Sequence, residues 1–177
     1  MASELIVQTL KGPTSGANAN KVIIPSGQTL DASAGGMTLP AGVGGKLLNV
    51  YQDLNQATGN TVTTSTSFIA TNLSVTLTPV SASSKFLLTT SLTAGAGSEA
   101  VLVTFYRGGT NLGDSTNGFG GTGYTGGRDN VAISYLDSPA TTASITYSVY
   151  WRSRGGGSIE LPPWPEYQTL IVTEIAG

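Results

Sequence analysis

Glu160 and Glu166 are the two carboxylates in this sequence whose spacing comes nearest to a catalytic dyad. They flank the Pro-Pro-Trp-Pro run at 162–165, and a pair of carboxylates can act as acid and nucleophile on a glycosidic bond. Two solvated loop carboxylates explain the same pattern more simply, and we favour that interpretation. The sequence contains no histidine and no cysteine, so Ser-His-Asp and Cys-His triads are excluded.

Other patterns that could hold a phosphate or a metal ion are incomplete. The glycine-rich run GFGGTGYTGG at 118–127 lacks the Lys-Ser/Thr pair and the following helix of a phosphate-binding loop. No Asp-x-Asp-x-Asp-Gly calcium loop occurs in the sequence. We therefore expect no catalytic residue, no cofactor and no metal site, which indicates that the protein is not an enzyme.

Two loops combine aromatic rings with polar side chains, which is the chemistry of a sugar-binding site. They span residues 113–129 and 152–167. In the simpler alternative, which we favour, Trp164 closes one end of the fold and Tyr124 packs on a neighbouring chain. The candidate ligand-binding residues under the first interpretation are Tyr124, Arg128, Asp129, Arg152, Trp164 and Tyr167.

The charge of the chain is low and evenly spread. Charged residues make up 10% of the 177 residues, and the net charge is −2. The eight basic residues form no cluster, so we expect no nucleic-acid binding. Residues 1–12 lack the regions of a signal peptide, and no apolar run is long enough to span a membrane, so we expect no membrane insertion. Low charge fits a chain that hides part of its surface in an assembly.

From residue 46 onward, apolar and polar residues alternate with the period of a half-buried strand. We expect a turn at Thr71 and Asn72, and loops at 94–97 and 114–127. Eight to ten short strands separated by turn signals predict an all-β domain at 46–177, an antiparallel β-sandwich of the jelly-roll type. The expected strands are 46–53, 61–70, 73–79, 85–93, 99–107, 129–135, 143–154, 158–161 and 169–175.

Residues 22–45 contain a short repeat, in which 22–27 aligns with 37–42. In each copy two apolar residues stand at strand spacing and are followed by Pro-x-Gly, which is turn chemistry. This segment is too short to form its own core, so either the following domain or identical strands from other chains must cover it. Gly42, Gly44 and Gly45 indicate a hinge before the β-domain. The candidate shaft residues are Val22, Ile24, Pro25, Gly27, Met37, Leu39, Pro40 and Gly42.

The repeat resembles the shafts of viral fibres, where strand-turn units from three chains wind around one axis. The runs SELIV at 3–7 and IPSGQTLD at 24–31 resemble the N-termini of tail-fibre proteins from marine and cyanobacterial phages. The runs FYRGGTNLG at 105–113, SYLDSPATT at 134–142 and LIVTEIAG at 170–177 resemble the compact β-domains of the same group. The resemblance implies a fibre-shaft-like β extension followed by a β-sandwich, and it has no catalytic motif to transfer.

As a member of this group, the chain would be a non-enzymatic structural protein on the surface of the virion. We expect a small homotrimeric tail fibre or spike, with the β-domain facing outward and a host surface glycan as a candidate ligand. Residues 1–21 would dock on other virion proteins, although a frayed terminus explains that segment equally well. The alternative within the same group is a capsid decoration (cement) or head-fibre protein. The candidate docking residues are Glu4, Leu5, Ile6 and Val7.

Overall fold

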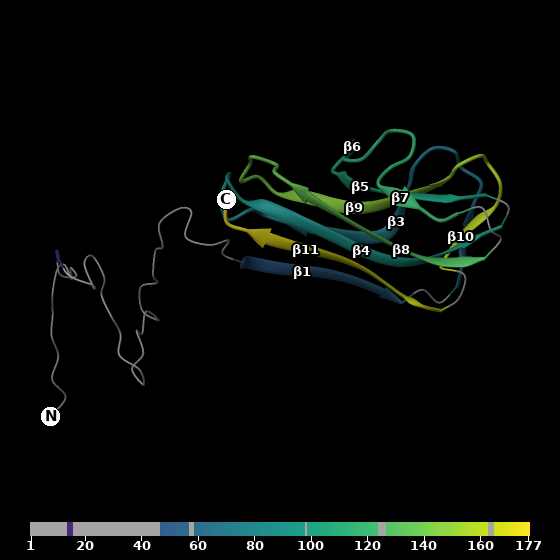
Figure 1. Ribbon diagram of the computed structural model, residues 1–177, viewed down its shortest axis with the longest axis horizontal. Coiled ribbons are helices and arrows are strands. Elements are labelled where there is room, and N and C mark those ends of the chain that lie inside the picture. Colours follow the sequence, from purple (N-terminus) through teal and green to yellow (C-terminus); the bar gives the residue numbers. More distant parts are fainter. Residues whose placement is uncertain (1–13, 16–46, 57–58, 98, 124–126, 163–164) are drawn as a thin grey trace, which may run out of the picture. The chain divides into compact units, whose positions relative to one another are not determined.

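The computed structural model of the protein describes residues 14–15, 47–56, 59–97, 99–123, 127–162 and 165–177. These residues form eleven strands in two antiparallel sheets that pack face to face, and no helix occurs among them (Figure 1). The predicted all-β sandwich is thereby confirmed. The shaft-like repeat at 22–45 lies outside the described residues, and so does the docking segment at 1–21 apart from Thr14 and Ser15. Both remain predictions.

The first sheet, sheet A, is built around the long strand β4. Strands β11 and β8 pair along its two sides, and β1 pairs with the far side of β11. The short strand β10 pairs with β4 beyond the end of β11, and β2 pairs with β10. The strands of sheet A are β1 (Leu47–Gln56), β11 (Tyr167–Ile175), β4 (Lys85–Ala96), β8 (Arg128–Asp137), β10 (Ile159–Leu161) and β2 (Thr61–Thr63).

The second sheet, sheet B, has the order β3, β9, β5, and two short strands pair with the outer edge of β5. One of these strands is β6, which pairs with the end of β5, and the other is β7, which pairs near its beginning. The strands of sheet B are β3 (Ile69–Leu77), β9 (Ile145–Ser153), β5 (Val101–Arg107), β6 (Thr110–Asn111) and β7 (Gly120–Gly121).

The connections between the strands follow jelly-roll order. The first strand of the described β-domain pairs with the last, as β1–β11. Each further pair joins segments nearer the middle of the chain, namely β3–β9, β4–β8 and β5–β7. The chain is therefore one antiparallel ribbon folded over itself, and the pairs β4–β11 and β5–β9 close the fold into two sheets. This order could not be derived from the alternation of apolar residues, which specifies faces and not neighbours.

The core lies between the two inner faces, as the alternation predicts. Tyr147, Val149 and Trp151 of β9 are buried on one face of that strand. Phe86 of β4 lies across from them, with its ring centroid 5.7 Å from that of Tyr147. Burying one large apolar side chain stabilises the fold by roughly 1.5–3 kcal/mol, so these inner faces hold the two sheets together.

The predicted turn at Thr71 and Asn72 is wrong, because β3 runs through both residues. The pairing of β3 with β9 shifts register between Ala70 and Ser74, which makes this segment a β-bulge. The hydroxyl of Thr71 donates to the carbonyl oxygen of Val149 at 2.9 Å and accepts from the N–H of Leu73 at 3.1 Å. The Thr71 side chain thus takes the place of a backbone hydrogen bond between β3 and β9. Thr-Asn has turn-like composition, but here it supplies a hydrogen-bonding side chain within a strand.

Two other predicted boundaries are corrected in the same way. The predicted loop at 94–97 is mostly strand, because β4 continues to Ala96 and pairs there with both β8 and β10. The predicted strand at 61–70 is two strands, since β2 ends at Thr63 and β3 begins at Ile69. The short strand β10 is the partner in both cases, since it pairs with the end of β4 and with β2, and the sequence does not reveal this pairing.

Asp137 links the two sheets at one side of the core. Its carboxylate accepts two hydrogen bonds from Arg107, at 2.9 and 2.8 Å, and one from the hydroxyl of Tyr147 at 2.6 Å. Asp137 belongs to β8 in sheet A, whereas Arg107 and Tyr147 belong to β5 and β9 in sheet B. Burial raises the pKa of Tyr147, and the hydrogen bond to the Asp137 carboxylate raises it further, so the hydroxyl stays a donor throughout the physiological range.

Glu174 is a second buried carboxylate, at the end of β11 that lies beside the beginning of β1. Asn49 Nδ2 donates to its Oε2 at 2.9 Å, and the N–H of Val80 donates to its Oε1 at 2.7 Å. Burial acts to raise the pKa of this carboxyl. The hydrogen bonds from Asn49, Val80 and Ser84 outweigh it, so that the pKa lies below the ordinary value.

We predict that Glu174→Gln destabilises the domain by about 1–3 kcal/mol at pH 7, because the new amide turns a donor toward groups that already donate. Since the pKa of Glu174 is lower in the folded chain, its contribution is fully present above pH 4.5, the ordinary value of a glutamate, and declines as the pH falls further. Urea unfolding of both proteins from pH 7 to pH 3 should therefore show that the difference between their free energies of unfolding becomes smaller in acid. The control is Asp129→Asn, which changes an exposed carboxylate. A free-energy difference that does not change with pH would contradict the lowered pKa of Glu174.

Candidate functional site

The face of sheet A that points away from the core carries no charged side chain over four successive rows. Each of the first three rows crosses β1, β11, β4 and β8 through directly paired residues, and the fourth row consists of two separate pairs. We call these residues the outer face of sheet A. They are Val50, Thr173, Leu87 and Leu136; Gln52, Ile171, Thr89 and Ser134; Leu54, Thr169, Ser91 and Ala132; and then Gln56 with Tyr167, and Thr93 with Asn130.

The outer face of sheet A is apolar at one end and hydroxyl-rich in the middle. Val50 is 57% exposed, Leu136 is 50% exposed and Leu87 is 36% exposed, although all three are aliphatic. Lys85 lies on β4 just beyond this row, and Arg128 lies at the far end of β8. An exposed aliphatic patch in an uncharged sheet surface is typical of a surface that another protein covers.

The outward side of sheet B differs, because its β5 region is covered by the chain itself. Thr104 faces away from the core and is nevertheless fully buried, beneath the segment 112–122. Gly118 has a φ of 63°, and a side chain there would collide with the carbonyl oxygen of Val103. Asp114 Oδ1 accepts from the N–H of Asn117 at 2.6 Å, which holds the turn and lowers the pKa of Asp114. The glycine-rich run therefore serves close backbone packing.

The residues predicted to bind a ligand are not gathered into one site. Tyr124 and Trp164 lie outside the described residues, so their proposed roles remain predictions. Arg128 and Asp129 are exposed at the beginning of β8. Tyr167 is 62% exposed at the beginning of β11, where it pairs with Gln56.

Among the candidates that the structure describes, only Arg152 is buried, and the fold uses its guanidinium internally. It donates from Nη1 to the carbonyl oxygen of Thr66 and from Nη2 to that of Thr116, and it lies 5.4 Å from the centroid of the Phe68 ring. Arg152 thus ties β9 to the segment before β3 and to the segment that covers β5. The alternation in β9 already places Arg152 on the side opposite Trp151, but not beneath these carbonyl groups.

The two glutamates that resembled a dyad have separate environments. Glu160 Oε2 accepts a hydrogen bond from Asn60 Nδ2 at 2.7 Å, whereas Glu166 follows Pro165 ahead of β11. Within the described ranges no group of three or more acidic, histidine or cysteine side chains could hold a metal ion. Among the same residues, no helix is long and apolar enough to cross a membrane.

Two of the hollows in the described part of the chain are considered as binding sites. The first, of about 500 Å³, lies where β4, β8 and β10 end and is lined by only seven residues, of which three are glycines. Its polar side chains are Arg128, Ser158 and Glu160. The second, of about 210 Å³, opens between the ends of the two sheets and is lined by amide side chains. The sequence predicted a binding role for none of the residues of this second pocket except those in the 152–167 loop.

No protein-family model matches the chain, and a search of curated proteins finds no significant match. The likeness to phage fibre proteins therefore rests on the short runs in the sequence.

We predict that Arg152→Met lowers the free energy of unfolding by about 2 kcal/mol, because methionine keeps the apolar stem and leaves the carbonyl groups of Thr66 and Thr116 without their donor. Urea denaturation followed by circular dichroism measures this loss. Lys85→Met is the control, since it removes an exposed positive charge and should shift the free energy by less than about 0.5 kcal/mol. Equal effects of the two substitutions would show that the buried guanidinium has no special structural role.

Proposed function

We propose that the protein is a non-enzymatic structural component of a phage particle, a small homotrimeric tail fibre or spike that attaches through its N-terminal segment. The observation that supports this proposal best is the outer face of sheet A, an uncharged sheet surface with exposed aliphatic side chains. Such a surface suits contact between protein chains, because covering it requires no charge to be desolvated. The resemblance of several short runs to phage fibre proteins supports the same function.

The position of β1 connects this surface with the predicted trimer. β1 begins at Leu47, almost directly after the repeat at 22–45, and it carries Val50 and Leu54 on the outer face of sheet A. If three copies of the repeat wind together, they bring three copies of β1 near one another. The outer face of sheet A would then be the surface through which neighbouring β-domains touch, leaving the rest of each domain exposed.

A capsid decoration or head-fibre protein is the alternative function within the same class. A flat face of threonine, serine and aliphatic residues can also lie on a shell of other proteins, and the β-sandwich serves both arrangements. Labelling intact particles with an antibody to the β-domain separates the two, because the label appears on the tail in one case and on the head in the other.

We predict a mass in solution of three times the 18.0 kDa chain, measured by light scattering, and dissociation when an aspartate is placed on the contact surface. Val50→Asp puts a charge on an exposed position, so it should leave the monomer folded while weakening association at least tenfold. The control Thr78→Asp adds the same charge at an exposed site beyond β3 and should leave the trimer intact. A wild-type chain that is monomeric at all concentrations would contradict the proposal.

We also predict that deleting residues 1–20 leaves the β-domain folded and abolishes incorporation into particles. The described strands all begin after residue 46, so their hydrogen bonds and core survive the deletion. Circular dichroism tests the fold, and immunoblotting of purified particles tests incorporation. Normal incorporation of the truncated chain would place the attachment site in the β-domain itself.

A further inference from the structure

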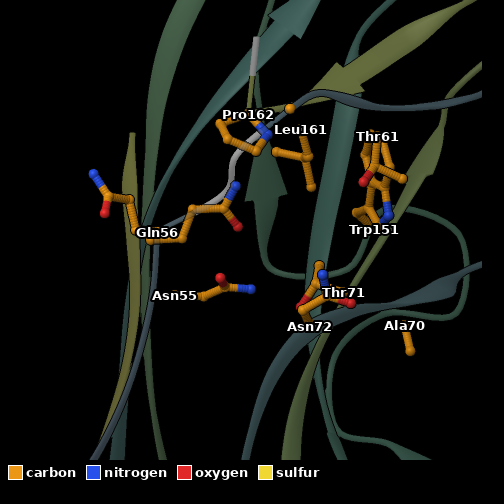
Figure 2. A pocket seen from close by; sticks show the side chains of 11 residues that line it. Asn55, Gln56, Thr61, Ala70, Thr71, Asn72, Trp151, Leu161 and Pro162 are labelled. Carbon is orange, nitrogen blue, oxygen red and sulfur yellow. The ribbon is translucent and has the colours of Figure 1, made fainter. Parts of the chain in front are cut away.

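The pocket between the ends of the two sheets is built from six separate segments. Figure 2 shows Asn55 and Gln56 at the end of β1 facing Thr71 and Asn72 of β3 across an open space. Leu161 and Pro162 lie along a further side, and Trp151 of β9 and Thr61 of β2 also line the pocket. Gln168 of β11 completes the lining. The pocket therefore lies along the seam where β1 of sheet A meets β3 of sheet B.

The bulge in β3 gives this pocket its polar wall. Side chains in a regular strand alternate between the two faces, yet Ala70, Thr71 and Asn72 line the pocket consecutively. One step farther along the seam, the N–H of Ser74 donates to Asp53 Oδ2 at 2.8 Å and joins β3 directly to β1. The seam is thus closed beside the bulge and open at the bulge itself.

Gln168 is the residue that points most strongly to a ligand. Its side chain is 5% exposed, and its amide makes no hydrogen bond with any described residue. The amides of Asn55, Gln56 and Asn72 also lack a partner among the described residues. Gln56 and Asn72 are exposed and Asn55 is half-buried, so these amides can exchange bound water for the donors and acceptors of a ligand.

The chemistry of the lining determines the class of that molecule. No lysine, arginine, aspartate or glutamate is among the described residues that line the pocket, so neither an anion nor a cation finds a counter-charge there. Trp151, Leu161 and Pro162 offer apolar contacts beside the amides. A sugar ring has this combination, with hydroxyl groups at its rim and C–H groups on its faces. We propose that the pocket binds a single neutral sugar residue.

The volume of the pocket limits how much of a glycan it accepts. About 210 Å³ corresponds to roughly seven water molecules at ~30 Å³ each, which suits one pyranose ring. The pocket would therefore take a terminal residue of a neutral glycan, with the remaining chain outside. This inference concerns the β-domain alone, so it stands whether or not the chain is a trimer or part of a virion.

The test uses the full-length chain labelled with ¹⁵N and the methyl glycosides of glucose, galactose, mannose and N-acetylglucosamine as probes. Side-chain amide signals of Asn55, Asn72 and Gln168 should shift on addition of at least one glycoside, with a dissociation constant on the order of 1 mM. The amide signal of Gln52, which lies on β1 but on the outer face of sheet A, should not move. Glucuronic acid and glucosamine test whether charge is tolerated, and neither should bind better.

Matched substitutions on β1 separate ligand binding from folding. Asn55→Ala removes a pocket amide and should weaken binding of the responsive glycoside about five- to tenfold, the loss of one hydrogen bond. Gln52→Ala removes an amide from the opposite side of the same strand and should leave the dissociation constant unchanged. Thermal midpoints of both variants are measured alongside, and Gln168→Glu, which places a carboxylate in the uncharged pocket, provides a second pocket variant.

Three results would overturn the proposal. They are the absence of any shift with all four glycosides at concentrations well above 1 mM, shifts confined to residues outside the pocket, and unchanged binding in both Asn55→Ala and Gln168→Glu. A trisaccharide of the same sugar shows whether the pocket recognises only the terminal residue or a longer part of the glycan. Affinity equal to that of the methyl glycoside supports recognition of one terminal residue, and much tighter binding would show a longer site.

Discussion

The burial of aromatic and aliphatic side chains between the two sheets is the constraint on which the rest of this fold depends. Trp151, Tyr147, Phe86 and Phe105 are almost wholly enclosed, and they come from strands of both sheets. Because each strand gives every second side chain to this layer, its other side chains must face outward. The uncharged outer face of sheet A and the covered outer side of β5 are two different solutions for those outward residues.

Several charged residues of this chain act inside the fold. Arg107 with Asp137, Arg152 beneath two carbonyl groups, and Glu174 beneath donors from Asn49 and Val80 each join segments distant in sequence. In an ordinary domain such groups would mostly be solvated. Here the surface carries even fewer charges than the composition suggests, because several of the few ionised groups are engaged in internal hydrogen bonds. That leaves hydroxyl, amide and aliphatic groups to define what the surface can contact.

The sequence predicted the strands well, because a half-buried strand repeats every two residues and the repeat is visible locally. It failed at Thr71 and Asn72, where turn-like composition hides a bulge, and at Arg152, whose hydrogen-bond partners come from elsewhere in the chain. The amide-lined pocket could not be predicted, since Asn55, Asn72 and Gln168 become neighbours only through the jelly-roll connections. The repeat at 22–45 and the docking segment are still known only as sequence patterns.

The place of β11 in sheet A has a consequence for how the domain is made. β11 is the last described strand in the chain, yet it lies between β1 and β4 and pairs with both along most of its length (Figure 1). Until residues 167–175 have been synthesised, β1 has no strand to pair with and one edge of β4 lacks its partner. The nascent chain must therefore keep its early strands from pairing with those of other chains until β11 has been made. Such long-range pairing is characteristic of slow-folding β-proteins.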